Sequence, residues 1–127
     1  MSVVLITGGT GAIGTALVEE FSRTEDVAFT FCSNEREAAA ICEKFRAFPV
    51  KMDVSDEKSV KEATERVLKE FGRIDVLVNN AGISLIKPFC DTTEDDWEKQ
   101  ISVNLTGCFR TSKAVVPQMI SRKAAQL

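Results

Sequence analysis

Short apolar runs alternate along the chain with longer stretches in which apolar and polar residues mix. The apolar runs are bounded by glycine, proline or charged residues and have the length and composition of β-strands. They are "VVLITG" (3–8), "VAFTFC" (27–32), "AFPVKMDV" (47–54) and "IDVLVNNAG" (74–82). The last run is apolar on both faces, which is typical of a parallel strand covered on both sides.

Between these runs, apolar residues recur at helical spacing. Helices are predicted over residues 12–23, 35–46 and 55–71, followed by a long helical segment over 92–123. In the first helix Ile13, Ala16, Leu17 and Phe21 share one face. In the third, Ser55 is the expected N-cap, Gly72 the expected end, and the buried stripe comprises Val60, Thr64, Val67, Leu68 and Phe71. Thr92 or Thr93 is expected to cap the long segment, and Pro117 to kink it.

Alternating strands and helices predict an α/β fold with a parallel sheet covered on both faces. Right-handed crossovers, with a reversal after the third strand, give a doubly wound, Rossmann-like sheet of order 3-2-1-4 within a single domain, residues 1–127. In such a sheet the ligand crevice lies where strands 1 and 4 diverge. Residues 7–14 and 79–82 both reach that crevice.

Composition narrows the class of protein. The 127 residues are 44% hydrophobic and 28% charged, with a formal net charge of −3, an ordinary globular balance. No basic cluster indicates a nucleic-acid surface, and no apolar run approaches the length of a membrane span. No basic region precedes the first apolar run, so we expect no signal peptide and a cytoplasmic location.

The residue types that are rare or absent limit the chemistry. Cys32, Cys42, Cys90 and Cys108 show no CxxC spacing and the chain has no histidine, so no metal site is expected. In a cytosolic chain these cysteines are expected to be reduced, partly buried thiols. The chain also contains no tyrosine.

The stretch "TGGTGAIG" (7–14) concentrates glycines between a strand and a helix. A pyrophosphate needs backbone N–H groups at close range, where a Cβ atom would block its approach, and the helix start adds positive potential. The alternative is a tight strand-to-helix turn that binds nothing.

Four ordered motifs resemble the short-chain dehydrogenase/reductase family. They are the glycine loop, Asp53–Val54, "NNAG" (79–82) and "VNLTG" around Asn104. The loop can be read as TGxxxGxG with Ala12 in place of the middle glycine, or as TGxxGxxG. The resemblance extends over nearly the whole chain and is strongest to 3-oxoacyl-carrier-protein reductases of fatty acid biosynthesis and related ketoreductases, which implies a nicotinamide dinucleotide as ligand.

The resemblance implies a role for each motif. Gly8, Thr10, Gly11, Ile13 and Gly14 would line the pyrophosphate and the adjacent ribose. Asp53 would accept a hydrogen bond from the adenine amino group beside the Val54 backbone, while Asn80, Ala81 and Gly82 would pass close to the nicotinamide-side ribose. From the residues alone, Asp53 could instead cap the next turn, and Asn79 and Asn80 could tie strand ends together.

Asn104 is a candidate for a catalytic role. It lies on the same helical face as Trp97, Ile101, Leu105 and Cys108, where a buried amide needs partners. Local backbone could satisfy it. The resemblance implies instead a helix distortion whose asparagine holds a water in a proton relay.

The end of the second strand bears on cofactor choice. A carboxylate there would bind the ribose 2′-hydroxyl of NAD and repel a 2′-phosphate. Phe31, Cys32 and Ser33 occupy these positions, and Ser33, Asn34 and Arg36 could receive a phosphate. NADP(H) is therefore favoured over NAD(H), with Glu35 as the residue that opposes this prediction.

The resembled family reduces carbonyls with a tyrosine as acid, a lysine four residues later and a serine, all beyond a fifth strand. This chain ends at "MISRKAAQL", where that strand would begin, so we expect a fold truncated after four strands. Lys113 has no tyrosine partner and is no substitute. Two functions remain: the cofactor-binding part of a ketoreductase, inactive alone, or a non-catalytic nucleotide-binding or interaction module. Self-association through the helix from Trp97 to Val116 is expected.

Overall fold

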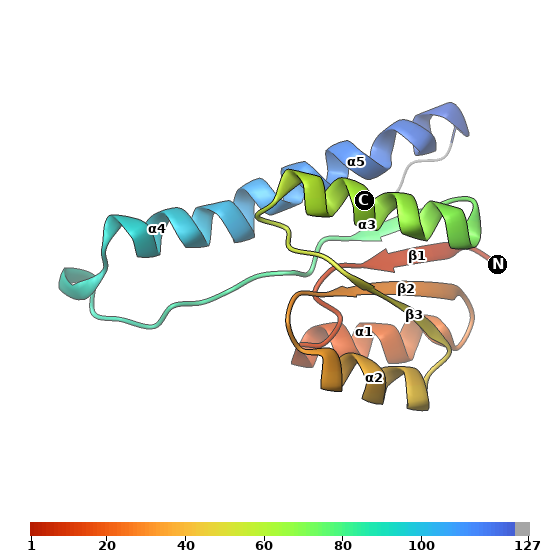
Figure 1. Ribbon diagram of the computed structural model, residues 1–127. Helices are drawn as coiled ribbons and strands as arrows, with labels where there is room; N and C mark the ends of the chain where they lie inside the picture. Colours follow the sequence, from red (N-terminus) through yellow and green to blue (C-terminus); the bar gives the residue numbers. More distant parts are fainter. Residues whose placement is uncertain (124–127) are drawn as a thin grey trace.

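The computed structural model describes residues 1–123. Strands and helices alternate through most of the chain (Figure 1). In order they are β1 (Val3–Ile6), α1 (Ala12–Ser22), β2 (Asp26–Phe31), α2 (Glu35–Lys44), β3 (Ala47–Lys51), α3 (Glu57–Phe71), β4 (Val76–Val78), η1 (Phe89–Asp91), α4 (Glu94–Ile101), η2 (Ser102–Thr106) and α5 (Gly107–Ser121). The expected beginning of a fifth strand falls partly on residues 124–127, which lie outside the described residues.

The four strands form one parallel sheet of order β3-β2-β1-β4, which confirms the predicted topology. Leu5 at the centre of β1 pairs with Ala28 of β2 on one side and with Leu77 of β4 on the other. All crossovers are helical, as parallel pairing requires. The carboxyl ends of β1 and β4 therefore meet at one edge of the sheet, with the glycine loop between β1 and α1.

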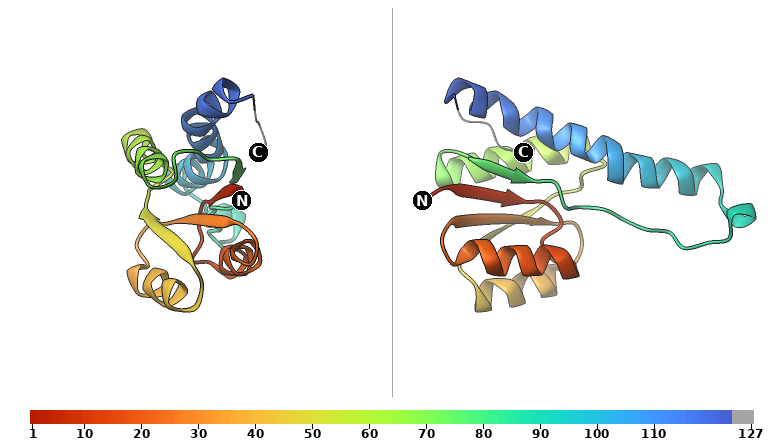
Figure 2. Two further views of the ribbon diagram at one scale, coloured as in Figure 1. Left: turned by 90° about the vertical axis from the view of Figure 1, so that its right-hand side faces the viewer. Right: turned by 180° about the vertical axis from the view of Figure 1, so that it is seen from behind.

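Helices cover both faces of the sheet (Figure 2). Each face buries its own apolar cluster. Val4 and Ile6 point to the face covered by α1 and α2, where they pack with Val18, Phe29 and Ile41. Leu5 points to the opposite face. There it joins Val60 and Val67 of α3 and Val115 and Met119 of α5. This alternation along β1 explains why the strand is apolar at every position.

Several element details differ from the sequence-based expectation. The N-cap of α3 is Asp56, whose carboxylate accepts from the Lys58 N–H, and not Ser55, whose hydroxyl bonds to Asp53. In α1 the buried positions are Gly14 and Val18, whereas Ile13 and Ala16 are exposed. In α3 the stripe includes Ala63, and Leu68 and Phe71 are only partly buried.

The predicted end of α3 is confirmed. Gly72 has a φ of 79° and its N–H donates to the Leu68 carbonyl. Such a left-handed C-cap is the usual role of glycine after a helix.

The fourth strand is much shorter than the apolar run predicts. Regular pairing covers only Val76–Val78, after which the chain leaves the sheet and runs in an extended path to η1 (Figure 1). Val76 and Val78 are partly buried and Leu77 is buried. Within the described sheet β4 is an edge strand, because it pairs only with β1.

The long helical segment is interrupted by a π-helix. Thr93 begins α4 with a capping box completed by Asp96, and η2 then introduces five residues of π-helix before α5. A π-helix inside an α-helix is a local distortion found often at functional sites. Trp97 and Leu105 are exposed, so the face that carries Asn104 is not buried as the sequence pattern predicted.

Asp75, just before β4, ties the sheet to the end of α5. Its carboxylate accepts from the Val3 N–H at 2.7 Å, from Arg73 Nε at 2.9 Å and from Arg122 Nη1 at 2.9 Å. Partial burial would raise the pKa of Asp75, but the Val3 bond and the two arginines hold that pKa below its usual value. The anion therefore fixes the start of β1 beside β4 and α5.

Candidate functional site

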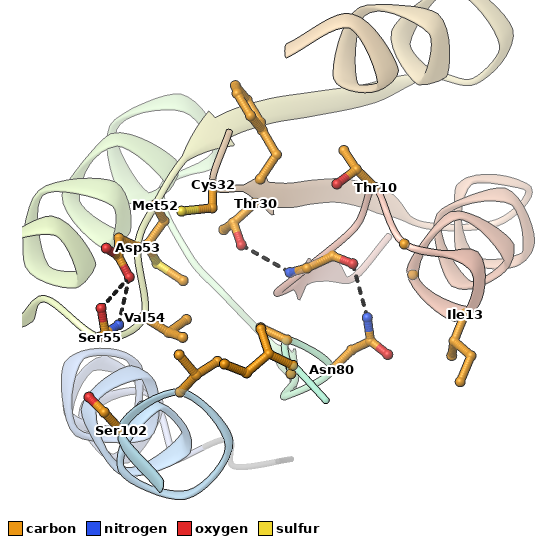
Figure 3. A pocket seen from close by; sticks show the side chains of 18 of the residues that line it. Thr10, Ile13, Thr30, Cys32, Met52, Asp53, Val54, Ser55, Asn80 and Ser102 are labelled. Atoms are coloured by element: carbon orange, nitrogen blue, oxygen red, sulfur yellow. Dashed lines mark hydrogen bonds between the residues drawn. The ribbon is translucent and has the colours of Figure 1, made fainter. Parts of the chain in front are cut away.

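A cleft of about 790 Å³ opens at the carboxyl ends of the strands. Figure 3 shows its lining residues converging from the glycine loop, the ends of β2 and β3, the segment after β4 and the π-helix. Ten of the twelve predicted cofactor-binding residues line it: Gly8, Thr10, Gly11, Ile13, Gly14, Asp53, Val54, Asn80, Ala81 and Gly82. The volume lies in the range typical of small-molecule and cofactor sites.

Thr7 and Asn80 join the diverging ends of β1 and β4. The buried hydroxyl of Thr7 accepts from the N–H groups of Asn80 and Ala81, each at 3.0 Å. The Asn80 amide donates to the carbonyls of Thr7 at 3.1 Å and Gly8 at 3.0 Å. The strand-tying alternative for Asn80 is therefore confirmed, and it leaves room for a ligand role because Asn80 also lines the cleft.

The glycines of the loop are required by close packing. A Cβ atom on Gly14 would lie 2.1 Å from the Gly8 carbonyl oxygen and 2.9 Å from Asn80 Nδ2. Gly8 has a φ of 67° and a Cβ there would lie 2.8 Å from Ala81 Cα. Backbone cannot yield at such distances, so these two glycines set the close approach of the loop, α1 and the segment after β4.

The amino end of α1 faces the cleft without a side-chain cap. Gly11 is the N-cap residue, no side chain accepts from the first turn, and that turn holds no acidic residue. The first N–H groups of any α-helix lack intrahelical partners. Gly11, Ala12 and Ile13 at this end line the cleft. Together with the helix dipole, the free N–H groups of the first turn give the cleft a positive, hydrogen-bond-donating wall.

The opposite end of the cleft is formed by Asp53, Val54 and Ser55. Asp53 Oδ1 accepts from the Ser55 N–H at 2.9 Å and from Ser55 Oγ at 2.6 Å, and the Asp53 N–H donates to Ser59 Oγ at 2.9 Å. The turn-forming role considered for Asp53 is thus confirmed. Asp53 also lines the cleft, as Figure 3 shows.

At the end of β2 the lining residues are Thr30, Phe31 and Cys32. Thr30 Oγ1 accepts from the Gly8 N–H at 3.2 Å and so fixes the glycine loop over β2. The lining does not extend to Ser33 or Asn34 within the described chain.

Asn34 instead caps α2, because its side chain accepts from the Glu37 N–H. Glu35 forms an exposed ion pair with Lys51 at 3.5 Å, and Arg36 is exposed. Among residues 1–123, Asp53 is the only carboxylate in the lining and Lys99 the only cation.

Asn104 lies in the π-helix and binds the segment after β4. Its Oδ1 accepts from the Ile83 N–H and its Nδ2 donates to the Ile83 carbonyl, each at 2.8 Å. These partners are distant in sequence, so the local-backbone alternative for Asn104 is wrong, while the expected helix distortion is confirmed. Ile83 lines the cleft, so Asn104 supports the wall and does not itself form it.

Over residues 1–123, no cluster of three or more potential metal ligands occurs, and no helix is both long and apolar enough to cross a membrane. All four cysteines are unpaired. Contrary to expectation, Cys32 and Cys90 are exposed, while Cys42 and Cys108 are partly buried.

Sequence reasoning missed several residues that build the cleft. The hydroxyls of Thr7 and Thr30 organise the loop, and Ser102 and Val103 of the π-helix complete the lining. Thr7 could have been found as the polar residue where a buried strand meets a glycine loop. The contribution of Ser102 and Val103 depends on the π-helix; the family resemblance implied a helix distortion at Asn104, but the apolar spacing alone did not show which neighbouring residues it turns to the cleft.

Three comparisons with known proteins agree with this geometry. A family model described as short chain dehydrogenase matches residues 2–127. Among curated proteins, the chain is 35% identical over 126 residues to the 3-oxoacyl-[acyl-carrier-protein] reductase FabG of Thermotoga maritima, covering 95% of this chain and 51% of the relative. It is 37% identical over 127 residues to the oxidoreductase UcpA of Escherichia coli, covering 97% of this chain and 48% of the relative.

A solved structure of a blue fluorescent protein from a metagenomic library, in complex with NADPH, superposes with a TM-score of 0.82 at 33% identity. That superposition covers 91% of this chain and 50% of the other. The chain thus spans about half the length of the curated relatives it matches. The family model extends over almost the whole sequence and agrees with the sheet order, the glycine loop and the cleft; the chain belongs to the short-chain dehydrogenase family.

Proposed function

We propose that residues 1–127 form the N-terminal, dinucleotide-binding part of an NAD(P)-dependent oxidoreductase similar to 3-oxoacyl-carrier-protein reductases. The single observation that carries the proposal is the open amino end of α1, placed by Gly8 and Gly14 against the cleft. This is the arrangement that binds a pyrophosphate in a Rossmann-like fold. The similarity to FabG of Thermotoga maritima supports the reductase class.

The residues fit a nicotinamide dinucleotide along the whole cleft. The α1 end would hold the pyrophosphate, and Asp53 with the Val54 backbone would hold the adenine. Asn80, Ala81 and Gly82 would lie beside the nicotinamide ribose. The bound dinucleotide would supply a hydride, while this chain's own residues bind it and fix its orientation.

NADP(H) is the favoured form in this proposal. On the β2 side the cleft presents Phe31 and Cys32, and Glu35 is paired with Lys51. No carboxylate lining that side is therefore available to repel a 2′-phosphate or to bind a 2′-hydroxyl. The solved relative in complex with NADPH is consistent with this preference. Ser33 and Asn34 remain the proposed phosphate contacts: Asn34 Oδ1 caps α2, and its Nδ2 would donate to the phosphate.

We propose that the isolated chain does not reduce carbonyl compounds. The acid expected from the family resemblance is a tyrosine, and the sequence contains no tyrosine and no histidine. Loss of general acid catalysis alone reduces rates by about 10²–10⁴-fold. Asn104 would contribute only by holding the π-helix and a relay water. The chain would then bind the dinucleotide without turnover, as a non-catalytic module also would.

Self-association is the proposed state of the isolated chain. Leu105 and Phe109 are 66% and 62% exposed, and Trp97 is exposed on the same long helical segment. Val115 is buried against the sheet and takes no part in this surface. A second copy would cover these apolar side chains. Light scattering after size-exclusion chromatography tests this, and a concentration-independent monomer near 14.0 kDa would contradict it.

A cytoplasmic location is also part of the proposal. It rests on the four unpaired thiols, two of them exposed, which suit a reducing compartment.

Isothermal titration of the chain with NADPH and with NADH tests the proposed function. Binding is expected to be measurable and stronger for NADPH. The variant Gly11→Ala should weaken the binding of both dinucleotides while the fold persists, because its Cβ would stand at the amino end of α1 with only the Gly8 carbonyl oxygen nearby, at 3.8 Å. If neither dinucleotide binds, the proposed function is wrong, and if NADH binds more tightly, only the cofactor preference is wrong.

A further inference from the structure

Arg110 makes an unusual set of contacts behind the cleft. Its Nη1 donates to the Val54 carbonyl at 3.0 Å, to the Ser102 carbonyl at 3.1 Å and to Ser102 Oγ at 3.3 Å. None of the ion pairs among residues 1–123 includes Arg110. The guanidinium is half-buried, and its hydrogen bonds go to backbone and hydroxyl oxygens.

The acceptors belong to two separate walls of the cleft. Val54 lies in the loop after β3 that forms the adenine end, and Ser102 begins the π-helix. Both residues line the cleft, while Arg110 does not. One guanidinium therefore bridges two cleft walls from behind. Hydrogen bonds from a charged donor are about twice as strong as neutral ones.

A second observation marks the same junction. Gly107, one turn before Arg110 on α5, is buried against Val54. A Cβ on Gly107 would lie 2.9 Å from Val54 Cγ2 and 3.1 Å from Val54 Cβ. The absence of a side chain lets the adenine-end loop pack directly on α5, and this close packing brings the Val54 carbonyl within reach of Arg110.

The π-helix connects Ser102 to the segment after β4, which lies at the other end of the cleft. It carries Asn104, which holds Ile83 by two hydrogen bonds. A contact path thus runs from Val54 through Arg110 and Ser102 to Asn104 and Ile83.

We propose that Arg110 is a positioning residue of the dinucleotide cleft: it holds the adenine-end loop and the π-helix in one relative position. The proposal rests on the proposed function, because it assigns to Arg110 an effect on dinucleotide affinity. Arg110 touches neither the proposed dinucleotide nor the reacting atoms and acts only through Val54 and Ser102.

The test compares Arg110→Met, Arg110→Lys and, as an arginine control, Arg23→Met. Arg23 ends α1, and within residues 1–123 its ion pairs are with the exposed Glu19 and Glu20. Each variant is titrated with ADP, which probes the adenine end, and with NADPH. Arg110→Met is expected to weaken both ligands about tenfold, Arg110→Lys to restore most of the affinity because an ammonium can donate to the same oxygens, and Arg23→Met to leave affinity unchanged.

Hydrogen exchange in the ligand-free chain gives a second readout. In Arg110→Met, the amides of Asp53, Ser55 and Ile83 are expected to exchange faster than the change in global stability explains. If Arg110→Met lowers the melting temperature but leaves ADP affinity and these amides unchanged, the role is purely structural and the proposal is overturned. If the unaltered chain binds neither ADP nor NADPH, the proposed function fails and this proposal fails with it.

Discussion

Two regions flank the cleft and are built in opposite ways. The glycine loop (residues 7–14) is packed by backbone against backbone, with Thr7 and Gly14 buried. The projecting arm (residues 83–101) extends away from the sheet in Figure 1 and in the right view of Figure 2, and Ile86 and Phe89 are 95% and 91% exposed.

The arm is held by bonds to itself and to the π-helix. Lys87 pairs with Asp96 at 2.7 Å, Leu85 N–H donates to Gln100 at 3.4 Å, and Ile83 is bound by Asn104. In the glycine loop, by contrast, the backbone packs so closely on its neighbours that Gly8, Gly9 and Gly14 have no room for a Cβ atom. The glycine-loop end of the cleft is therefore fixed by packing, whereas the end beyond Ile83 depends on a few exposed polar bonds.

The largest effect is expected at the glycine loop. Gly14→Ala should lower the free energy of unfolding by about 3 kcal/mol, because the new Cβ meets the Gly8 carbonyl oxygen and Gly9 Cα. Chemical denaturation measures this change. The control is Gly11→Ala, where the only neighbour within 4 Å is the Gly8 oxygen at 3.8 Å, so the fold should persist while phosphate approach is hindered. Equal stability of both variants would contradict the packing account.

Thr7→Val should have the next largest effect. It keeps the shape of the side chain but leaves the Ala81 N–H without its acceptor and the Asn80 N–H with only the Val78 carbonyl at 3.1 Å, at a cost of about 2 kcal/mol. Thermal unfolding measures the loss. In the control, Thr111→Val, the deleted hydroxyl only donates back to the Gly107 carbonyl within α5, so little change is expected. A larger loss in the control would mean that the Thr7 bonds do not hold the strand ends.

Asn104→Ala should affect the arm and leave the glycine loop intact. Loss of two exposed bonds to Ile83 should cost about 1 kcal/mol and speed hydrogen exchange at Ile83. Exchange at the Gly9 N–H, which donates to the Thr30 carbonyl, should stay unchanged. Asn79→Ala, which removes an exposed bond to Ser112, is the matched control. Equal acceleration at Gly9 and Ile83 would show that the two regions are not independent.

The smallest effect is expected from acid. The Lys87 ammonium and then the Thr93 N–H lower the pKa of Asp96 from 3.8 to about 2. A lowered folded-state pKa means that the stabilisation is present above pH 3.8 and is lost as the pH falls towards 2. Trp97, the only tryptophan, adjoins Asp96 and reports the change by fluorescence. Asp96→Asn should remove this transition, and its persistence in the variant would assign it to another group.

The regular part of the fold follows from the sequence because it depends on local periodicity. Strands buried on both faces have no polar positions, and the helices between them show a clear apolar face. The strand order then follows from the handedness of crossovers. Gly8 and Gly14 were identifiable for a similar reason, since a glycine cluster between a strand and a helix has few structural explanations.

The projecting arm could not be predicted in the same way. The run "IDVLVNNAG" is apolar enough for a longer strand, but Asn80 bonds to Thr7 and Gly8 and turns the chain out of the sheet. The face of Trp97 and Leu105 has helical spacing, yet no element of the described chain covers it. The role of Arg110 depends on a π-helix that shifts residues away from the usual helical spacing.

The central claim is that the cleft between the glycine loop and residues 53–55 binds a nicotinamide dinucleotide. Amide chemical-shift mapping of the chain during titration with NADPH tests it most directly. Saturable shifts are expected at Gly8, Gly11, Ile13 and at residues 53–55. A second groove of about 590 Å³, lined by residues of α3 and α5 that include Lys61, Leu68 and Phe109, is expected to stay unaffected. Shifts confined to that groove, or no shifts at the glycine loop at millimolar NADPH, would contradict the account.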